Sequence, residues 1–143
     1  PKTVAHIVRN HDVTLIKNLV NRELNKLCDG EKLSNSDVSI LHDNVDKDVL
    51  DLASETLKQR NGSSNMLWDS GDCYSAEWPA VIVLHQVRES KKMDNIVTLY
   101  LQISRARVYC VIVLFPEEGK VFKTSHMSGL LDKLSGHVQI IPH

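Results

Sequence analysis

Cysteine is scarce in this chain, and the placement of its cysteines excludes several kinds of chemistry. The 143 residues include only three, Cys28, Cys73 and Cys110, and no two of them have CxxC spacing. A sparse, odd set of cysteines is typical of proteins whose thiols stay reduced. We therefore expect a cytoplasmic or nuclear protein without a disulfide framework.

Recognisable metal-ligand spacing is also missing. A zinc site needs three or four ligands at such spacing. No two histidines of this chain form an HxxxH or HExxH pair, so the sequence predicts no metal site and no cofactor. The histidines are scattered along the chain: His6, His11, His42, His85, His126, His137 and His143.

Long apolar runs and a charge excess of one sign are absent as well. The longest apolar run, Val108 to Phe115, is far shorter than the roughly 20 residues that span a bilayer. The first residues show no signal-peptide pattern. Lysine and arginine number 17 against 18 acidic residues, which gives a net charge of −1. We expect no membrane association and no dedicated binder of duplex nucleic acid.

The stretch richest in β-branched residues runs from Trp78 to Phe115, and the rest of the fold is expected to form around it. Ala80 to Val87 is apolar and follows Pro79, which belongs at the start of a strand. Residues 96–104 alternate between apolar and polar, the pattern of a strand with one buried face. Residues 108–115 are apolar on both faces, which predicts an inner strand. Because short polar links join the three, we expect an antiparallel meander.

Helical patterns fill the first half of the chain. Apolar residues at helical spacing follow Asp12, an N-cap residue, and predict a helix over residues 12–28 that ends before Gly30. A second helical stripe runs from Val38 to Gly62. Asp46 could cap a second start within it, so one kinked helix or two helices fit this stretch.

Shorter elements complete the expected fold. Residues 3–8 fit a short strand or a lead-in, and a short strand is expected through Leu67. Further on we expect a strand over 120–123, a helix that ends at Gly136 and a last strand over 138–141. The expected class is α+β: N-terminal amphipathic helices packed on an antiparallel sheet of about four to five strands, followed by a short C-terminal helix and strand.

The size of the chain predicts one globular domain over residues 1–143, since 42% of its residues are hydrophobic and suffice for a core. The chain opens on Pro1 rather than on an initiator Met, so we expect a segment of a larger protein. No catalytic motif is present. The leading hypothesis is therefore a non-enzymatic protein–protein interaction module of a larger intracellular scaffold or regulatory protein.

A thiol-dependent enzyme is the weakest alternative. Cys73 follows a glycine turn, and His85 or His126 could meet it in three dimensions. Such catalysis needs a lowered thiol pKa and an oriented base, and the sequence shows no local signature of either. Cys110 lies between apolar residues of a strand and is expected in the core. We therefore predict no catalytic residue.

The predicted partner-binding surface is the segment that joins two tryptophans. Its residues have neither helical nor strand period, which indicates a loop. Large aromatic side chains are unusual in exposed loops unless a binding partner covers them. Acidic residues at its rim suit a basic-hydrophobic peptide. The alternative is that both tryptophans close the base of the core. The predicted contact residues are Trp68, Asp69, Asp72, Tyr74 and Trp78.

Nucleic-acid binding is the principal alternative function. Residues 1–77 carry 9 basic and 13 acidic residues, whereas residues 78–143 carry 8 basic and 5 acidic residues. In this mildly basic half, four residues could form a stacking platform for single-stranded nucleic acid. Ordinary packing of tyrosines on a sheet explains the same pattern. The four residues are Tyr100, Arg105, Arg107 and Tyr109.

Self-association is a further expectation. If Ala80 to Val87 is an edge strand, its unpaired backbone could add a strand from a second copy and form a homodimer.

Overall fold

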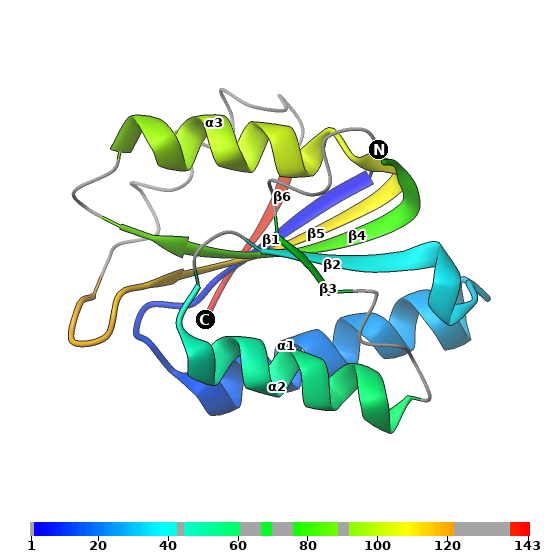
Figure 1. Ribbon diagram of the computed structural model, residues 1–143, viewed down its shortest axis with the longest axis horizontal. Helices are drawn as coiled ribbons and strands as arrows, with labels where there is room; N and C mark the ends of the chain where they lie inside the picture. The colour runs from blue at the N-terminus through cyan, green and yellow to red at the C-terminus, as the bar shows by residue number, and fades with distance from the viewer. Residues whose placement is uncertain (1, 43–44, 61–66, 70–75, 89–91, 122–137) are drawn as a thin grey trace.

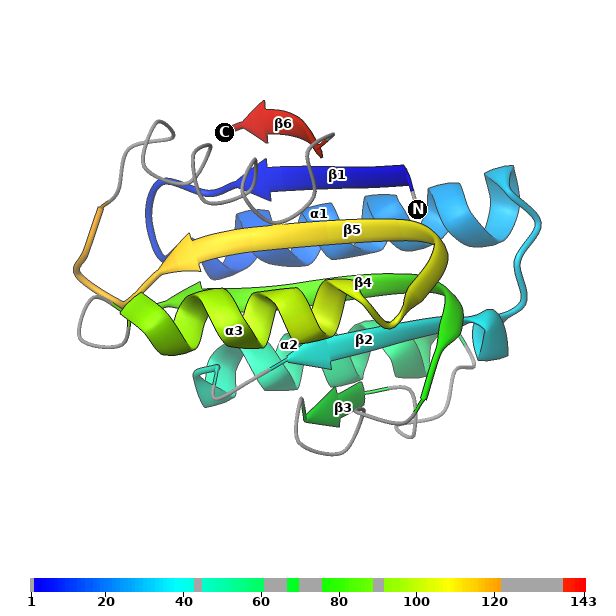
Figure 2. The ribbon, with the colours of Figure 1, turned by 90° about the horizontal axis from the view of Figure 1, so that it is seen from above.

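In the computed structural model, six strands of the described residues form a single, entirely parallel sheet (Figure 1, Figure 2). Their order is β3-β2-β4-β5-β1-β6, and every registered pair is parallel. The structure describes the chain except for residues 1, 43–44, 61–66, 70–75, 89–91 and 122–137. The strands are β1 (Lys2–Ile7), β2 (Val38–His42), β3 (Leu67–Asp69), β4 (Trp78–Val87), β5 (Ala106–Pro116) and β6 (Val138–Pro142).

The predicted antiparallel meander is wrong, and so is the α+β class that was built on it; the arrangement is α/β. Most of the stretch that was expected to be the middle strand belongs instead to a helix, α3 (Lys92–Ile103), which connects β4 to its parallel neighbour β5. Parallel neighbours need a crossover of this length, whereas antiparallel neighbours need only a hairpin. The alternating pattern misled because Leu99 and Ile103 also share one helical face. Both are buried, whereas Val97 and Tyr100 are exposed.

The first predicted helix is confirmed. It is α1 (Val13–Asn25), and it continues into a π-helical turn at Lys26–Gly30. The Asp12 side chain caps it by accepting a hydrogen bond from the Leu15 N–H at 3.1 Å. Figure 1 shows α1 and α2 on one face of the sheet and α3 on the other.

The second helical stripe divides into a strand and a helix. Its first residues form β2, and the helix proper is α2 (Lys47–Gln59), with Asp46 at its N-cap position. The second start predicted at Asp46 is therefore right, while a helix from Val38 is wrong. The apolar residues of β2 are buried because this strand lies between β3 and β4 with helices on both sides of the sheet.

The prediction of an inner strand at residues 108–115 is confirmed by β5. Val111, Val113 and Phe115 belong to the apolar cluster under α1 and α2. Cys110 and Ile112 belong to the cluster under α3. Short strands predicted near residues 3–8, at Leu67 and over 138–141 are also present, as β1, β3 and β6.

Two expectations meet other outcomes. Strand β4 lies between β2 and β5, so Ala80 to Val87 is an inner strand and cannot form the edge through which a homodimer was predicted. Among the described strands, the two at the edges of the sheet are β3 and β6. The helix predicted before Gly136 and residues 122–123 of the strand predicted over 120–123 lie outside the described residues, and Lys120 and Val121 are described but belong to no strand. No helix in the described part of the chain is long and apolar enough to cross a bilayer.

Candidate functional site

The loops at the carboxyl end of the sheet lie where open α/β folds bind ligands. Strands β2 and β4 are neighbours, but the helix after β2 covers one face of the sheet and the helix after β4 covers the other (Figure 1). Such a reversal is a topological switch point, and ligands bind in the crevice outside the strand ends there. The residues at this point are Asp46, which follows β2, and Gln86 and Arg88, at the end of β4.

These three residues bind one another and join the two loops. The Asp46 backbone N–H donates to Gln86 Oε1 at 2.9 Å, and Gln86 Nε2 donates to Asp46 Oδ2 at 2.9 Å. Arg88 Nη2 donates to Gln86 Oε1 at 3.2 Å and lies 3.5 Å from Asp46 Oδ1. Gln86 is only 3% exposed. The Gln86 side-chain amide therefore links β4 to the N-terminus of α2 through two hydrogen bonds.

His11 adds the loop after β1 to this cluster. Its Nδ1 lies 3.2 Å from the Pro116 carbonyl oxygen, and its Nε2 lies 3.2 Å from Asp48 Oδ2 and 3.9 Å from Asp46 Oδ2. Burial alone lowers the pKa of His11. The hydrogen bonds to Asp48 and Pro116 and the two carboxylate charges outweigh burial, so the pKa is raised above its ordinary value. The imidazolium form can donate at both nitrogens, which suits these acceptors.

The same three side chains have the composition of a cation site. His11 Nε2 and one oxygen from each of Asp46 and Asp48 lie within 4.8 Å of one another. With the Nδ1–H donated to the Pro116 carbonyl, a neutral imidazole would present Nε2 as a metal ligand. The nitrogen and oxygen atoms that would bind a cation already form ion pairs and hydrogen bonds with one another and with Gln86 and Arg88. This internal pairing explains the cluster as well as a cation would. The prediction of no metal stays a prediction.

A second group of polar residues lies at the opposite end of the sheet, where α3 leads into β5. Tyr100 is 56% exposed, and the Ser104 N–H donates to the Tyr100 carbonyl at 3.1 Å, one helical turn away. Arg105 Nε and Nη2 donate to Ser104 Oγ at 3.3 and 3.1 Å, which holds the guanidinium beside that turn. Arg107 and Val108 are exposed at the start of β5. We call these five residues the α3–β5 corner.

Tyr109 does not belong to this corner. Its hydroxyl donates to Glu31 Oε2 at 2.7 Å, and its ring packs against the apolar cluster under α1 and α2. That hydrogen bond raises the pKa of Tyr109. Tyr100 lies on α3, on the other side of the sheet (Figure 1). Tyr100 and Arg105 therefore lie at the same corner, with Arg107 exposed at the start of β5, whereas Tyr109 packs on the other face of the sheet.

The two tryptophans of the predicted partner surface come from different strands. Trp68 is in register with Leu41, which is in register with Val83 of β4. Trp78 begins β4, five residues before Val83. At about 3.3 Å per residue, the two tryptophan Cα atoms are about 16 Å apart along the strands. Trp78 is half-buried and packs against the cluster under α3, which favours the alternative of a core role for it.

The remaining predicted site residues lie mainly outside the described part of the chain. Asp69 ends β3. Asp72 and Tyr74 are not described, and neither are Cys73 and His126 of the thiol-enzyme alternative, so both ideas stay predictions. Cys110 is 1% exposed, and burial raises its pKa to about 12, which confirms the expected core thiol.

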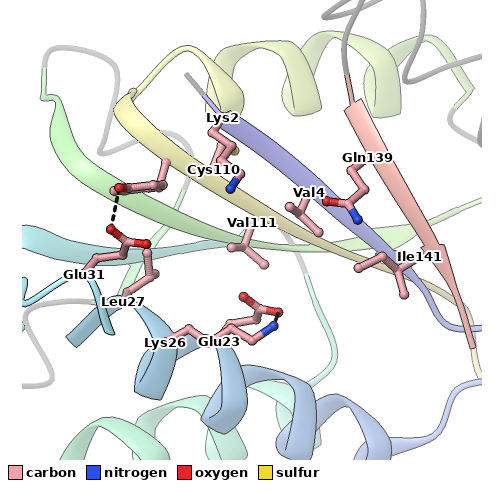
Figure 3. A pocket seen from close by; sticks show the side chains of 11 residues that line it. Lys2, Val4, Glu23, Lys26, Leu27, Glu31, Cys110, Val111, Gln139 and Ile141 are labelled. Atoms are coloured by element: carbon pink, nitrogen blue, oxygen red, sulfur yellow. Dashed lines mark hydrogen bonds and ion pairs between the residues drawn. The ribbon is translucent and has the colours of Figure 1, made fainter. Parts of the chain in front are cut away.

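A cavity of about 220 Å³ lies between α1 and the sheet strands β5, β1 and β6 (Figure 3). Its wall includes Glu23, which is 5% exposed and whose Oε1 lies 2.8 Å from His6 Nε2. His6 Nδ1 in turn lies 2.8 Å from His143 Nε2. The hydrogen bond from His6 lowers the pKa of Glu23 despite its burial, so this carboxylate stays charged.

Sequence reasoning missed both the His11 cluster and the cavity. Their residues come from segments far apart in the chain, and the parallel topology brings them together. One available signal was Asp46, which was identified as a cap residue but not as a neighbour of Gln86. A second signal was that Glu23 falls on the apolar face of the amphipathic helix α1 at helical spacing.

The chain is similar to a solved structure with which it shares only 16% sequence identity. This is the crystal structure of the C-terminal domain of a possible DNA helicase from Lactobacillus plantarum WCFS1. The likeness has a TM-score of 0.62 and covers 98% of this chain and 85% of that chain. At this identity it establishes a shared fold. No protein-family model matches the chain, and a search of curated proteins gives no significant match.

Proposed function

We propose that this chain is a domain of a larger helicase-related protein and that its α3–β5 corner binds the phosphates and bases of single-stranded nucleic acid. The observation that carries the proposal is the fold shared with the C-terminal domain of the possible DNA helicase, over 98% of this chain and 85% of that chain. Binding, rather than catalysis, is the role proposed for the described residues.

The chemistry of the corner supports this proposal. An aromatic face beside cations is the combination that binds single strands, because bases stack on the ring and phosphates meet the charges. Tyr100 supplies an exposed ring, and Arg105 and Arg107 supply two guanidinium groups within a few residues of it. Arginine suits phosphate because its planar fork donates two hydrogen bonds at once.

The corner has two arginines, and this small charge limits the affinity that we expect for single-stranded nucleic acid. Two phosphate contacts to a single strand predict a shallow salt dependence, with a slope of about −1.4 in log K against log salt. The net charge of the chain, −1, argues against a strong duplex binder. We therefore expect weak, sequence-tolerant binding of single strands.

The decisive experiment measures fluorescence anisotropy of a labelled oligothymidylate against the 143-residue chain. Tyr100→Ala should weaken binding by about tenfold or more, since one stacked base is worth about 1–3 kcal/mol. Arg107→Ala should weaken binding by removing a phosphate contact and should reduce the salt slope by about 0.7. Tyr109→Phe and Arg9→Ala are matched controls, because Tyr109 lies on the other face and Arg9 is an exposed arginine at the other end of the sheet; both should bind normally.

A second titration uses ATP in place of the oligonucleotide. Binding of ATP but not of the strand would assign the arginines to a nucleotide phosphate. Equal loss of strand binding in Tyr109→Phe and Tyr100→Ala would contradict the proposed corner.

A protein-binding role is the second candidate, and one observation favours it. Strand β3, which carries Trp68, forms one edge of the sheet, and its outer side meets no other strand in the described part of the chain. Such an edge can add a strand from a partner. Trp68→Ala should weaken capture of a basic-hydrophobic peptide by about 2 kcal/mol if the tryptophan is an anchor.

A further inference from the structure

The cavity between α1 and the sheet combines an apolar floor with a buried carboxylate (Figure 3). We propose that it receives one basic side chain, lysine or arginine, from a partner polypeptide. This proposal does not depend on nucleic-acid binding at the α3–β5 corner, because α1 and α3 lie on opposite faces of the sheet.

The size of the cavity limits what can enter it. Pockets for drug-sized ligands and cofactors measure about 300–1,000 Å³, whereas this one measures about 220 Å³ and is open to solvent. One long side chain fits this space better than a nucleotide. Val4, Leu27, Val111 and Ile141 line it, so the methylene stem of a lysine or arginine would meet apolar surface.

The buried Glu23 carboxylate in the cavity wall favours a cationic ligand. Glu23 is 5% exposed, and both of its partners meet the same oxygen: His6 Nε2 at 2.8 Å and Lys26 Nζ at 3.7 Å from Oε1. No hydrogen bond from a described residue reaches Oε2. A buried carboxylate with an unused oxygen is stabilised by a cation that donates to it. An ammonium or guanidinium group in the cavity could do so.

Lys26 is the competitor already in place. Its side chain is 64% exposed, and its nitrogen lies beyond hydrogen-bond distance from Glu23. Figure 3 shows Lys26 beside Glu23 and Lys2 on the sheet side of the cavity. An exposed lysine can turn into solvent at little cost, so an incoming cation displaces a weak contact. Glu31, which also lines the cavity, adds a second negative charge, and Lys2 and Lys26 add two positive ones, so the preference for a cation comes from the burial of Glu23.

The test uses N-acetyl-arginine amide and N-acetyl-lysine amide as probes, with N-acetyl-norleucine amide as the uncharged match for lysine. NMR titration should show saturable shifts at the backbone amides of Val4, Leu27 and Val111. A single side chain should bind in the millimolar range, and the norleucine probe at least about tenfold more weakly. Absence of saturable shifts with both basic probes would overturn the proposal.

Variants separate the pocket from general charge effects. Glu23→Gln should abolish binding, while Glu118→Gln, the same change at an exposed site, should not. Lys26→Met should tighten binding by about threefold because it removes the competitor. Val4→Phe keeps the carboxylate and fills the cavity, so it should abolish binding even if Glu23→Gln fails to fold. Unchanged binding in Val4→Phe, or tighter binding of spermidine than of the arginine probe, would contradict a pocket for a protein side chain.

Discussion

At the carboxyl end of the sheet, Gln86, Asp46 and Arg88 bind one another, whereas at the amino end Tyr100, Arg107 and Val108 face solvent. Arg107 makes no ion pair with any described residue. Polar groups that are bonded internally contribute to stability, and groups that face solvent are free to meet a ligand. The side chains at the switch point are therefore engaged with one another, whereas those at the amino end are available to a ligand. This difference predicts that changes at the first end alter folding and changes at the second alter binding.

The largest effect is expected in β5, the strand that runs between the two ends of the sheet. Ile112 is fully buried in β5, so Ile112→Asp places an unpaired charge in the core and should destabilise the fold by several kcal/mol. Circular dichroism should show no cooperative melt. A melting temperature close to that of the unaltered chain would mean that one face of β5 is open to solvent. It would contradict the fold on which the comparison of the two ends depends.

The next largest effect is expected from loss of the hydrogen bonds between Gln86 and Asp46 at the carboxyl end of the sheet. Gln86→Leu keeps the volume but leaves the Asp46 N–H and Asp46 Oδ2 without their partner, which should cost about 1–3 kcal/mol. Urea unfolding measures the change, and Gln59→Leu on the exposed face of α2 is the matched control. If Gln86→Leu were as stable as its control, the carboxyl end would be open for ligands after all.

The third effect should appear in binding and not in stability. Tyr100 is exposed, so Tyr100→Ala should change the free energy of unfolding by less than about 0.5 kcal/mol. Oligothymidylate binding should fall at the same time, while Gln86→Leu, where it is folded, should leave binding unchanged. A Tyr100→Ala variant that loses stability and binding together would identify Tyr100 as a structural residue.

The smallest effect depends on pH. The pKa of His11 is raised in the folded chain above its ordinary value of 6.5. The charged form is therefore stabilised by folding, and this contribution is complete below the unfolded pKa and is lost as pH rises through the folded pKa. The stability advantage of the unaltered chain over His11→Asn should be at most about 1 kcal/mol. Urea unfolding at acidic and alkaline pH should show it shrinking as pH rises; an advantage that grew with pH would contradict the imidazolium assignment.

Local pattern predicted some elements well. The helix from Asp12 and the inner strand at residues 108–115 could be predicted because each buries a continuous apolar face with the right period. Residues 96–104 could not, because Leu99 and Ile103 fit a strand and a helix equally well over so short a stretch. Of the candidate sites, the group of Tyr100, Arg105, Arg107 and Tyr109 was proposed because these residues are close together in the chain; it stays a prediction, and the structure places Tyr109 on another face of the sheet.

Local sequence patterns were enough to predict which segments are apolar, where α1 is capped, and that β5 is covered on both faces. The tertiary structure decided that the strands run parallel, because pairing direction depends on whether a connection crosses over the sheet, and α3 is that connection. It also decided which polar residues meet. His11, Asp48 and Pro116 are separated by long stretches of chain, and the alignment of strand ends brings them within hydrogen-bond distance. No local pattern encodes that distance, because it depends on the order of the strands in the sheet.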